Sequence, residues 1–422
     1  MGIYLNPGKE SFQMAVNSEI FVDKTDMIQY LNSVVNTNQR YVSVSRPRRF
    51  GKTMAADMIC AYYDRKADSR ELFSRRKVAG CEPARVGGRE IAWDTYLGRF
   101  DVIRLVMTDF IKPEKSITEC LDLLTARVLD DFLEEYPGVK YDPQDLFYSL
   151  DRFYRSTGIQ FVIVIDEWDA VFRIWKDDVT GQTKYLDFLR DWMKDKPYIA
   201  LAYMTGILPI KKYGKHSALN MFTEYSMVSP KQLAEYVGFT KGEVLKICSD
   251  RELNYESMKA WYDGYRLSNL PSEDLAENAV SLNGYAVYEI YNPLSVVSAA
   301  SFRKLENYWN KSETFEALAE YIRRDYDGLK EAVALLMDGG RVQIDTSTYQ
   351  NDMTTFHGRD DVLSLLIHLG YLGFDSETSE VFIPNREILD EFRTSTKTSE
   401  WAETFKDHNV QNQKVLEITV KE

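Results

Sequence analysis

The sequence predicts an α/β protein with a mainly parallel sheet in its first half and a mainly helical second half. Apolar runs at 41–44, 161–165 and 198–204 have the length and composition of buried strands. The run at 161–165 ends abruptly in two carboxylates, as buried parallel strands do where they bring polar side chains to the edge of a sheet. Later in the chain, apolar residues recur mainly at helical spacing.

The first strand leads into a loop ending Gly51-Lys52-Thr53, and an apolar-periodic helix follows. This order is the context of a phosphate-binding P-loop, or Walker A motif, in which backbone N–H groups and a helix N-terminus cradle phosphate oxygens. Lys52 would neutralise the outer phosphates, and the Thr53 hydroxyl would coordinate Mg²⁺. The residues expected to contact ATP here are Arg46, Pro47, Arg48, Arg49, Phe50, Gly51, Lys52, Thr53 and Met54.

The loop departs from the usual P-loop pattern at two positions. Arg46 stands where the pattern has its first glycine, and Pro47 has no N–H to donate. An arginine-rich surface turn is therefore the alternative interpretation of the loop taken alone.

The second motif is the strand 161–165 with the Asp166-Glu167 pair that follows it. The position of Asp166 corresponds to a Walker B acid, which holds Mg²⁺. That of Glu167 corresponds to the base that aligns the attacking water. A strand that simply turns into a solvated acidic loop is the alternative. The two motifs together predict a nucleotide site, and hence a P-loop NTPase core.

Further strands fit between and after these motifs. The run 101–107 is a candidate strand, and Ser116 with Glu119 has the spacing of a capping box that starts a helix. The strand 198–204 ends at Thr205, which we expect to sense the γ-phosphate. An N-cap role for Thr205 is the alternative.

The domain organisation follows from this change of pattern. We expect an ATPase domain over residues 1–230, a mainly helical domain over 231–395, and a tail or the start of a further domain over 396–422. A helix from 360, a short strand at 381–383 and a helix over 386–392 could form a winged-helix-like unit. A plain helical lid is the alternative.

Composition limits the class of protein. The chain has 422 residues and a formal net charge of −13, which disfavours an extensive nucleic-acid-binding surface. It has no apolar run long enough to span a bilayer and no secretory leader pattern. The four cysteines show neither metal-ligand spacing nor a disulfide framework, so we expect a reduced, cytoplasmic protein.

These motifs together resemble a bacterial family of AAA-ATPase-like proteins. The family's loop has the same Arg-Pro-Arg-Arg form as 46–49. The other matching segments are 21–25, 165–167, 205–207, 217–220, 261–265, 291–293, 307–309 and 383–385. The resemblance implies a RecA-like ATP-binding core. Many members add a restriction-endonuclease-type domain, but its acidic and lysine pattern is not found after residue 395, so nuclease chemistry is not expected.

The expected function is Mg²⁺-dependent ATP binding and hydrolysis coupled to a conformational change. Glu167 and Lys52 are the candidate catalytic residues, and Thr53 and Asp166 are the candidate metal ligands. Lys211 and Lys212, or a neighbouring subunit, are candidates for the missing cationic finger. The alternatives are a nucleotide-binding switch or scaffold with little turnover, and a DNA-associated module. A homo-oligomer or a protein partner is compatible with each of these.

Overall fold

The computed structural model describes residues 2–210, 218–271, 280–282, 285–309, 319–322, 326 and 328–397. The chain divides into two compact units. The N-terminal unit comprises Met1–Arg46, Gly51–Ser226 and Asn351–Thr354. The C-terminal unit comprises Pro47–Phe50, Met227–Gln350 and Thr355–Glu422. Lys211 and Lys212, and the expected tail from 398 onward, lie outside the described residues.

A five-stranded parallel sheet forms the centre of the N-terminal unit, as the sequence predicts. Its strand order is β4-β5-β6-β1-β7. The strands are β4 (Asp101–Val106), β5 (Phe161–Asp166), β6 (Ile199–Gly206), β1 (Tyr41–Ser45) and β7 (Thr223–Tyr225). Every residue of β1, β5 and β6 is buried, which explains the continuous apolar runs of β5 and β6. In β1, Ser43 and Ser45 are buried alongside the apolar residues.

The register of the sheet brings the carboxyl ends of β1, β5 and β6, which carry polar residues, to the same end of the sheet. Asp166 on β5 is opposite Thr205 on β6, and Ser45 on β1 is opposite Gly206 on β6. Asp166 therefore lies at the carboxyl end of a central strand, one strand away from the P-loop strand. This confirms the placement expected from the apolar run before it.

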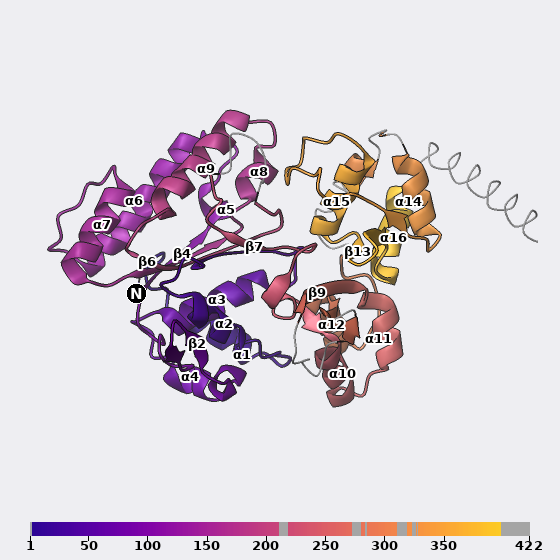
Figure 1. Cartoon of the computed structure of the whole chain (residues 1–422), viewed down its shortest axis with the longest axis horizontal. Coiled ribbons are helices and arrows are strands. Elements are labelled where there is room, and N and C mark those ends of the chain that lie inside the picture. The colour runs from indigo at the N-terminus through magenta and orange to yellow at the C-terminus, as the bar shows by residue number, and fades with distance from the viewer. Residues whose placement is uncertain are drawn as a thin grey trace, which may run out of the picture. The chain divides into compact units, whose positions relative to one another are not determined.

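Helices cover both faces of this sheet (Figure 1). The helix after the P-loop, α3, packs on β4, β5 and β6, while α6, α7 and α9 lie on the opposite face. A capping box between Ser116 and Glu119 starts α6, as predicted. The helices of the unit are α1 (Glu10–Val16), α2 (Met27–Val34), α3 (Lys52–Tyr63), α4 (Arg70–Ser74), η1 (Lys77–Gly80), α5 (Met107–Phe110), α6 (Ile117–Glu135), α7 (Leu146–Thr157), α8 (Ala170–Ile174) and α9 (Val179–Met193). A hairpin of β2 (Ala84–Val86) and β3 (Arg89–Ile91) completes it.

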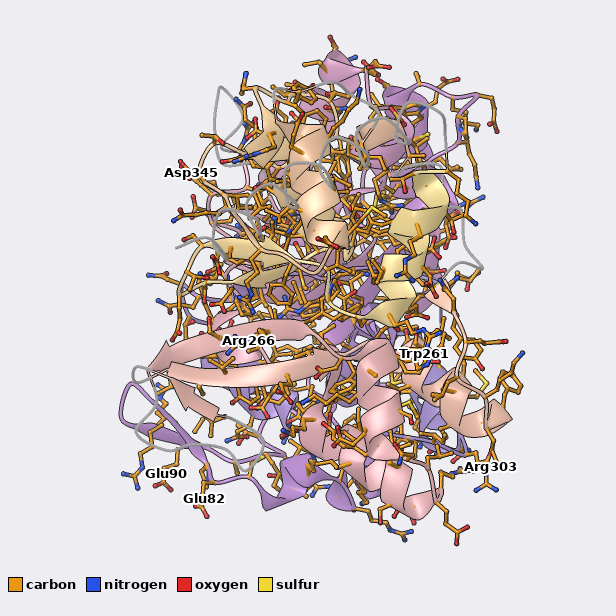
Figure 2. The ribbon with its side chains drawn as sticks, turned by 90° about the vertical axis from the view of Figure 1, so that its right-hand side faces the viewer. Glu82, Glu90, Trp261, Arg266, Arg303 and Asp345 are labelled. Atoms are coloured by element: carbon orange, nitrogen blue, oxygen red, sulfur yellow. The ribbon has the colours of Figure 1, made fainter. Side chains whose placement is uncertain are left out.

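The first part of the C-terminal unit combines helices with an antiparallel sheet. Its elements are η2 (Lys231–Leu233), β8 (Phe239–Thr240), α10 (Lys241–Asp250), α11 (Tyr255–Tyr262), β9 (Tyr265–Pro271), β10 (Val280–Leu282), β11 (Tyr285–Tyr291) and α12 (Pro293–Phe302). Arg266 lies on β9 and Trp261 on α11 (Figure 2). The sequence analysis did not predict β9 and β11. Polar residues at 266, 268 and 269 interrupt the apolar residues of β9, and Glu289 interrupts those of β11.

The second part contains the helix, hairpin and helix that the sequence predicts. Its elements are α14 (Leu329–Met337), β12 (Val342–Gln343), α15 (Arg359–Leu369), β13 (Gly373–Asp375), β14 (Glu380–Phe382) and α16 (Arg386–Ser395). The short strands form one antiparallel sheet in the order β12-β14-β13. Gly370, at φ +88°, ends α15 in the left-handed conformation that glycine adopts readily.

Candidate nucleotide-binding site

The N-terminus of α3 forms the centre of the candidate site. Gly51 precedes the helix with φ +90°, a left-handed conformation that a glycine adopts without strain. The first turn of an α-helix has N–H groups that no intrahelical carbonyl accepts, and here that turn comprises residues 52–54. Together with the helix dipole, these groups favour an anion such as a phosphate.

Lys52 is the first residue of α3, and its side chain is buried within the loop. Its Nζ donates a hydrogen bond to the Arg46 carbonyl oxygen at 3.0 Å. Burial lowers the pKa of Lys52 to about 8. The carboxylates of Asp166 and Asp169 oppose this shift without cancelling it. A phosphate bound here would add a negative charge beside the buried ammonium.

Thr53 and Asp166 meet across the end of the sheet. The Thr53 hydroxyl donates to Asp166 Oδ2 at 2.8 Å, and Asp166 Oδ1 accepts the Glu167 N–H at 3.0 Å. A hydroxyl beside a buried carboxylate supplies the hard oxygen ligands that Mg²⁺ takes from proteins, the rest coming from water and substrate phosphates. Within the described part of the chain, no cluster of three or more histidine, cysteine or acidic side chains could hold a metal by itself.

Arg104, on β4, is a member of the site that sequence reasoning missed. Its Nη2 lies 3.3 Å from both Asp57 Oδ1 and Asp166 Oδ2. Burial opposes its charge, but neighbouring groups, including both carboxylates, outweigh burial and raise the pKa of Arg104. The one sequence signal was a charged residue in the middle of an otherwise buried strand, 101–106.

Glu167, the expected base, follows β5 directly and adopts a left-handed backbone with φ 51°. Its Oε2 accepts a hydrogen bond from Arg173 Nη2 at 2.8 Å. Arg173 comes from α8, and sequence reasoning did not connect it to the site. The spacing of six residues across an irregular turn gives no periodic signal.

Thr205 is the last residue but one of β6, and its side chain is fully buried. Among the described residues its Oγ1 has no hydrogen-bond partner, so the N-cap that the sequence left open is not observed there. Its carbonyl oxygen accepts the Trp168 N–H at 3.2 Å. A buried hydroxyl at the same sheet edge as Asp166 is placed to respond to an added acceptor.

The arginines of the loop have protein partners in the structure. Arg46 is fully buried, and its Nη1 donates to the carbonyl oxygens of Ser45 and Tyr225 at 2.9 Å each. Burial lowers the pKa of Arg46 to about 10. These bonds turn the guanidinium to β1 and β7, so the backbone carbonyl of Arg46, not its side chain, reaches Lys52.

Residues Pro47–Phe50 group with the C-terminal unit. Within that unit, Arg49 Nη1 donates to the Tyr308 carbonyl oxygen at 2.8 Å. The buried Phe50 ring packs edge-on against Tyr265, with ring centroids 5.2 Å apart. Arg48 is half-buried. The structure thus divides the predicted loop, placing its ends with the sheet and its middle four residues with the second unit.

Comparison with known families agrees with this geometry. Residues 8–214 match a family model described as AAA-ATPase-like, a predicted AAA-ATPase. Residues 8–214 are thus similar to the AAA-ATPase-like family. The match includes the P-loop, Asp166, Glu167 and Thr205, so the coarse function of the family is ATP binding by a P-loop ATPase.

Three solved structures that match the chain are remote from it in sequence. The Orc1 protein of Aeropyrum pernix in complex with DNA has 12% identity and a TM-score of 0.29, covering 93% of this chain and 98% of that one. The Orc2 protein of the same organism, in ADPNP and ADP complexes, has 11% identity, a TM-score of 0.35 and coverages of 90% and 96%. Cdc6p of Pyrobaculum aerophilum has 12% identity, a TM-score of 0.26 and coverages of 94% and 93%. Curated protein sequences gave no match.

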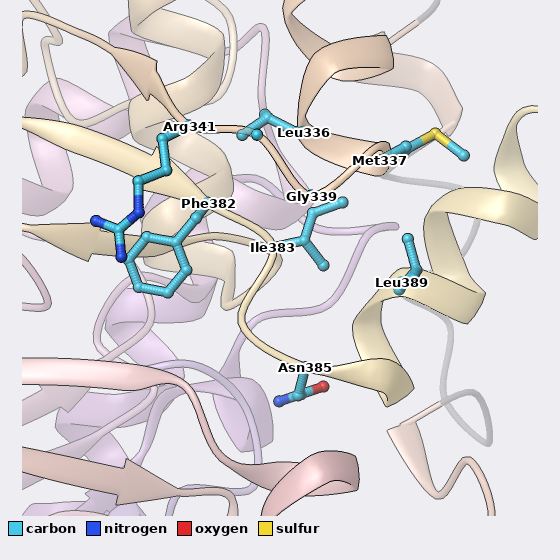
Figure 3. Close-up of a pocket in the computed structure, with 9 residues that line it drawn as sticks. Leu336, Met337, Gly339, Arg341, Phe382, Ile383, Asn385 and Leu389 are labelled. Carbon is cyan, nitrogen blue, oxygen red and sulfur yellow. The ribbon is translucent and has the colours of Figure 1, made fainter.

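The C-terminal unit contains a separate pocket of about 280 Å³ (Figure 3). Arg341 packs over the Phe382 ring at its rim, 4.7 Å from the ring centroid, and forms ion pairs with Asp375 and Glu380. The lining residues are Leu336, Met337, Gly339, Gly340, Arg341, Phe382, Ile383, Asn385 and Leu389. None of these belongs to the predicted nucleotide site.

Proposed function

We propose that this protein binds Mg-ATP at the N-terminus of α3 and hydrolyses it, and that nucleotide turnover drives a conformational change. The observation that carries the proposal is the Thr53–Asp166 hydrogen bond of 2.8 Å, which joins the P-loop helix to the acidic end of β5. In this proposal, Lys52 binds the outer phosphates, Thr53 and Asp166 hold the metal, and Glu167 aligns water.

Magnesium would add charge neutralisation at the phosphates when bound. Thr53 and Asp166 would hold it, with Arg104 fixing the Asp166 carboxylate from the other side. The N–H groups at 51–54 would bind phosphate oxygens, which gives Gly51 and Met54 a role through their backbone. Thr205 would contact the γ-phosphate. No cationic finger is assigned, because Lys211 and Lys212 lie outside the described residues.

A nucleotide-binding switch with little turnover is the second candidate. The observation that favours it is the ion pair of Glu167 with Arg173, because a carboxylate already paired with a guanidinium has less capacity to accept a proton. A DNA-associated role has weaker support. Asp360, in the first turn of α15, adds a negative charge to the unit expected to be winged-helix-like, and acidic side chains repel a phosphate backbone.

The proposal also includes the cellular compartment and the partners of the protein. All four cysteines are free in the structure, which supports the expectation of a reducing, cytoplasmic compartment. Among the described residues, no helix has both the length and the apolar character needed to cross a membrane. A homo-oligomer or a protein partner would supply the cationic finger if the chain itself does not.

The substitution Glu167→Gln tests the enzyme against the switch. It keeps the shape of the side chain and removes the base, so Mg-ATP should still bind through Lys52, Thr53 and Asp166. Single-turnover hydrolysis should fall by about 10²–10⁴-fold, the usual contribution of general acid–base catalysis. Glu90→Gln, at an exposed position on β3, is the matched control and should leave the rate unchanged.

Binding and hydrolysis are measured on the same preparations. A wild type that binds ATP but shows no turnover, alone or with DNA, would favour the switch. A Glu167→Gln protein that hydrolyses at the wild-type rate would exclude Glu167 as the base. A loss that only follows a loss of folded protein, measured by circular dichroism, would assign Glu167 a structural role.

A further inference from the structure

Arg173 lies between the carboxylates of Glu167 and Asp169, which differ in their exposure to solvent. Its Nη2 donates to Glu167 Oε2 at 2.8 Å, and its Nε lies 3.3 Å from Asp169 Oδ2. The Arg173 side chain is 12% exposed, that of Asp169 is fully buried, and that of Glu167 is 40% exposed. One guanidinium thus connects an interior acid to an acid that faces solvent.

Asp169 is fixed independently of Arg173. Its Oδ2 accepts the backbone N–H groups of Ile207 and Leu208 at 3.1 and 3.0 Å. These residues directly follow β6, the strand that ends at Thr205 and Gly206. Asp169 therefore anchors Arg173 to the end of the strand that carries the candidate γ-phosphate sensor.

The arrangement leaves one oxygen of the expected base available. Arg173 occupies Oε2 of Glu167, whereas Oε1 accepts no hydrogen bond from the described residues. A planar guanidinium fixes a carboxylate more precisely than a lysine ammonium does, because its N–H groups form a rigid fork. A glutamate held at one oxygen and open at the other can accept a hydrogen bond from a water molecule in a defined direction.

We propose that Arg173 is a positioning residue that orients Glu167 toward the attacking water, and that Asp169 couples this orientation to the end of β6. The proposal rests on the proposed ATPase function. It makes Arg173 act through Glu167 and not on the nucleotide. A change at Thr205 on phosphate binding would reach the base along Ile207, Asp169 and Arg173.

The test is a double-mutant cycle on single-turnover ATP hydrolysis. Arg173→Gln should lower the rate by about 10–100-fold, the usual cost of misplacing a catalytic group, while calorimetric affinity for Mg-ATP is retained. Combined with Glu167→Gln, it should cause no further loss, because both changes remove the same function. Arg190→Gln, on α9, removes a surface arginine paired with Asp187 and is the matched control.

Arg173→Lys covers the case in which Arg173→Gln does not fold. It keeps a positive charge beside buried Asp169 but cannot span both carboxylates, so we expect a folded protein with an intermediate rate. Additive losses in the cycle, an increased rate, or a parallel loss of ATP affinity would each overturn the positioning role. A wild type without hydrolysis would instead overturn the proposed function, and this inference with it.

Discussion

At the scale of single residues, the ammonium of Lys52 is buried, and a bound phosphate would stabilise its charge. The ammonium has a pKa of about 8 and donates to the Arg46 carbonyl oxygen inside its own loop. A carbonyl oxygen compensates less of the cost of burying a charge than an anionic phosphate oxygen does. The same burial that makes the ammonium costly in the nucleotide-free protein therefore favours nucleotide binding.

This arrangement predicts a pH dependence of ATP affinity. The nucleotide-free protein loses the Lys52 proton above about pH 8, whereas bound phosphates would keep the lysine protonated. Binding must then take up a proton, so affinity should be constant below pH 8 and fall above it, by as much as about tenfold per pH unit. Calorimetric titrations between pH 7 and 10 would measure this. The Lys52→Ala variant should lack this fall, and an equally steep fall in that variant would assign the effect to another group.

At the scale of elements, the end of β6 packs tightly against residues that adjoin the candidate site. A Cβ added to Gly206 would lie 2.7 Å from Asp169 Oδ1 and 2.8 Å from Trp168 Cδ1. Both contacts are shorter than real Cβ atoms show, and Asp169 is the anchor of Arg173. The glycine at this position thus allows α8 and the end of β6 to approach closely.

Gly206→Ala should accordingly reduce both stability and turnover. We expect a loss of about 1–3 kcal/mol in the free energy of unfolding, as for overpacking elsewhere, measured in urea. The hydrolysis rate of the remaining folded protein should also fall, because Asp169 must move. Gly80→Ala is the control, since an added Cβ there meets nothing within 4 Å. Equal behaviour of the two variants would show that β6 and α8 adjust without affecting the site.

Sequence reasoning succeeded where a pattern was local and periodic. The apolar run of β5, the glycine before α3 and the capping box of α6 each have a short-range signal. Arg104 and Arg173 have none, because their roles depend on which carboxylates the sheet and α8 bring beside them. The same limit applies to the middle of the loop, since no pattern shows that Arg49 bonds the distant Tyr308.

At the scale of the whole molecule, the net charge favours binding of a nucleotide over binding of DNA. The formal net charge of −13 repels a polyanion over most of the surface, while a single nucleotide needs only a local cationic site. The buried arginines Arg46 and Arg104 are engaged inside the fold, with carbonyl oxygens and carboxylates respectively. They therefore do not add to a basic outer surface.

We therefore expect weak or no binding to duplex DNA. Fluorescence anisotropy with a labelled duplex at low salt should show no saturation up to about 10 µM protein, a concentration at which non-specific DNA binders are commonly bound. Addition of Mg-ATP should not change this result. Saturable binding whose affinity falls steeply with salt would contradict the expectation and support the DNA-associated alternative.

Calorimetric titration of Mg-ATP into the wild type and Lys52→Ala tests the central claim most directly. Lys194→Ala, at an exposed position after α9, is the matched control. The wild type and Lys194→Ala should bind one ATP per chain with equal affinity, and Lys52→Ala should bind much more weakly, because the outer phosphates lose a buried cation. Equal affinities of all three proteins would remove Lys52 from the site and contradict the P-loop account.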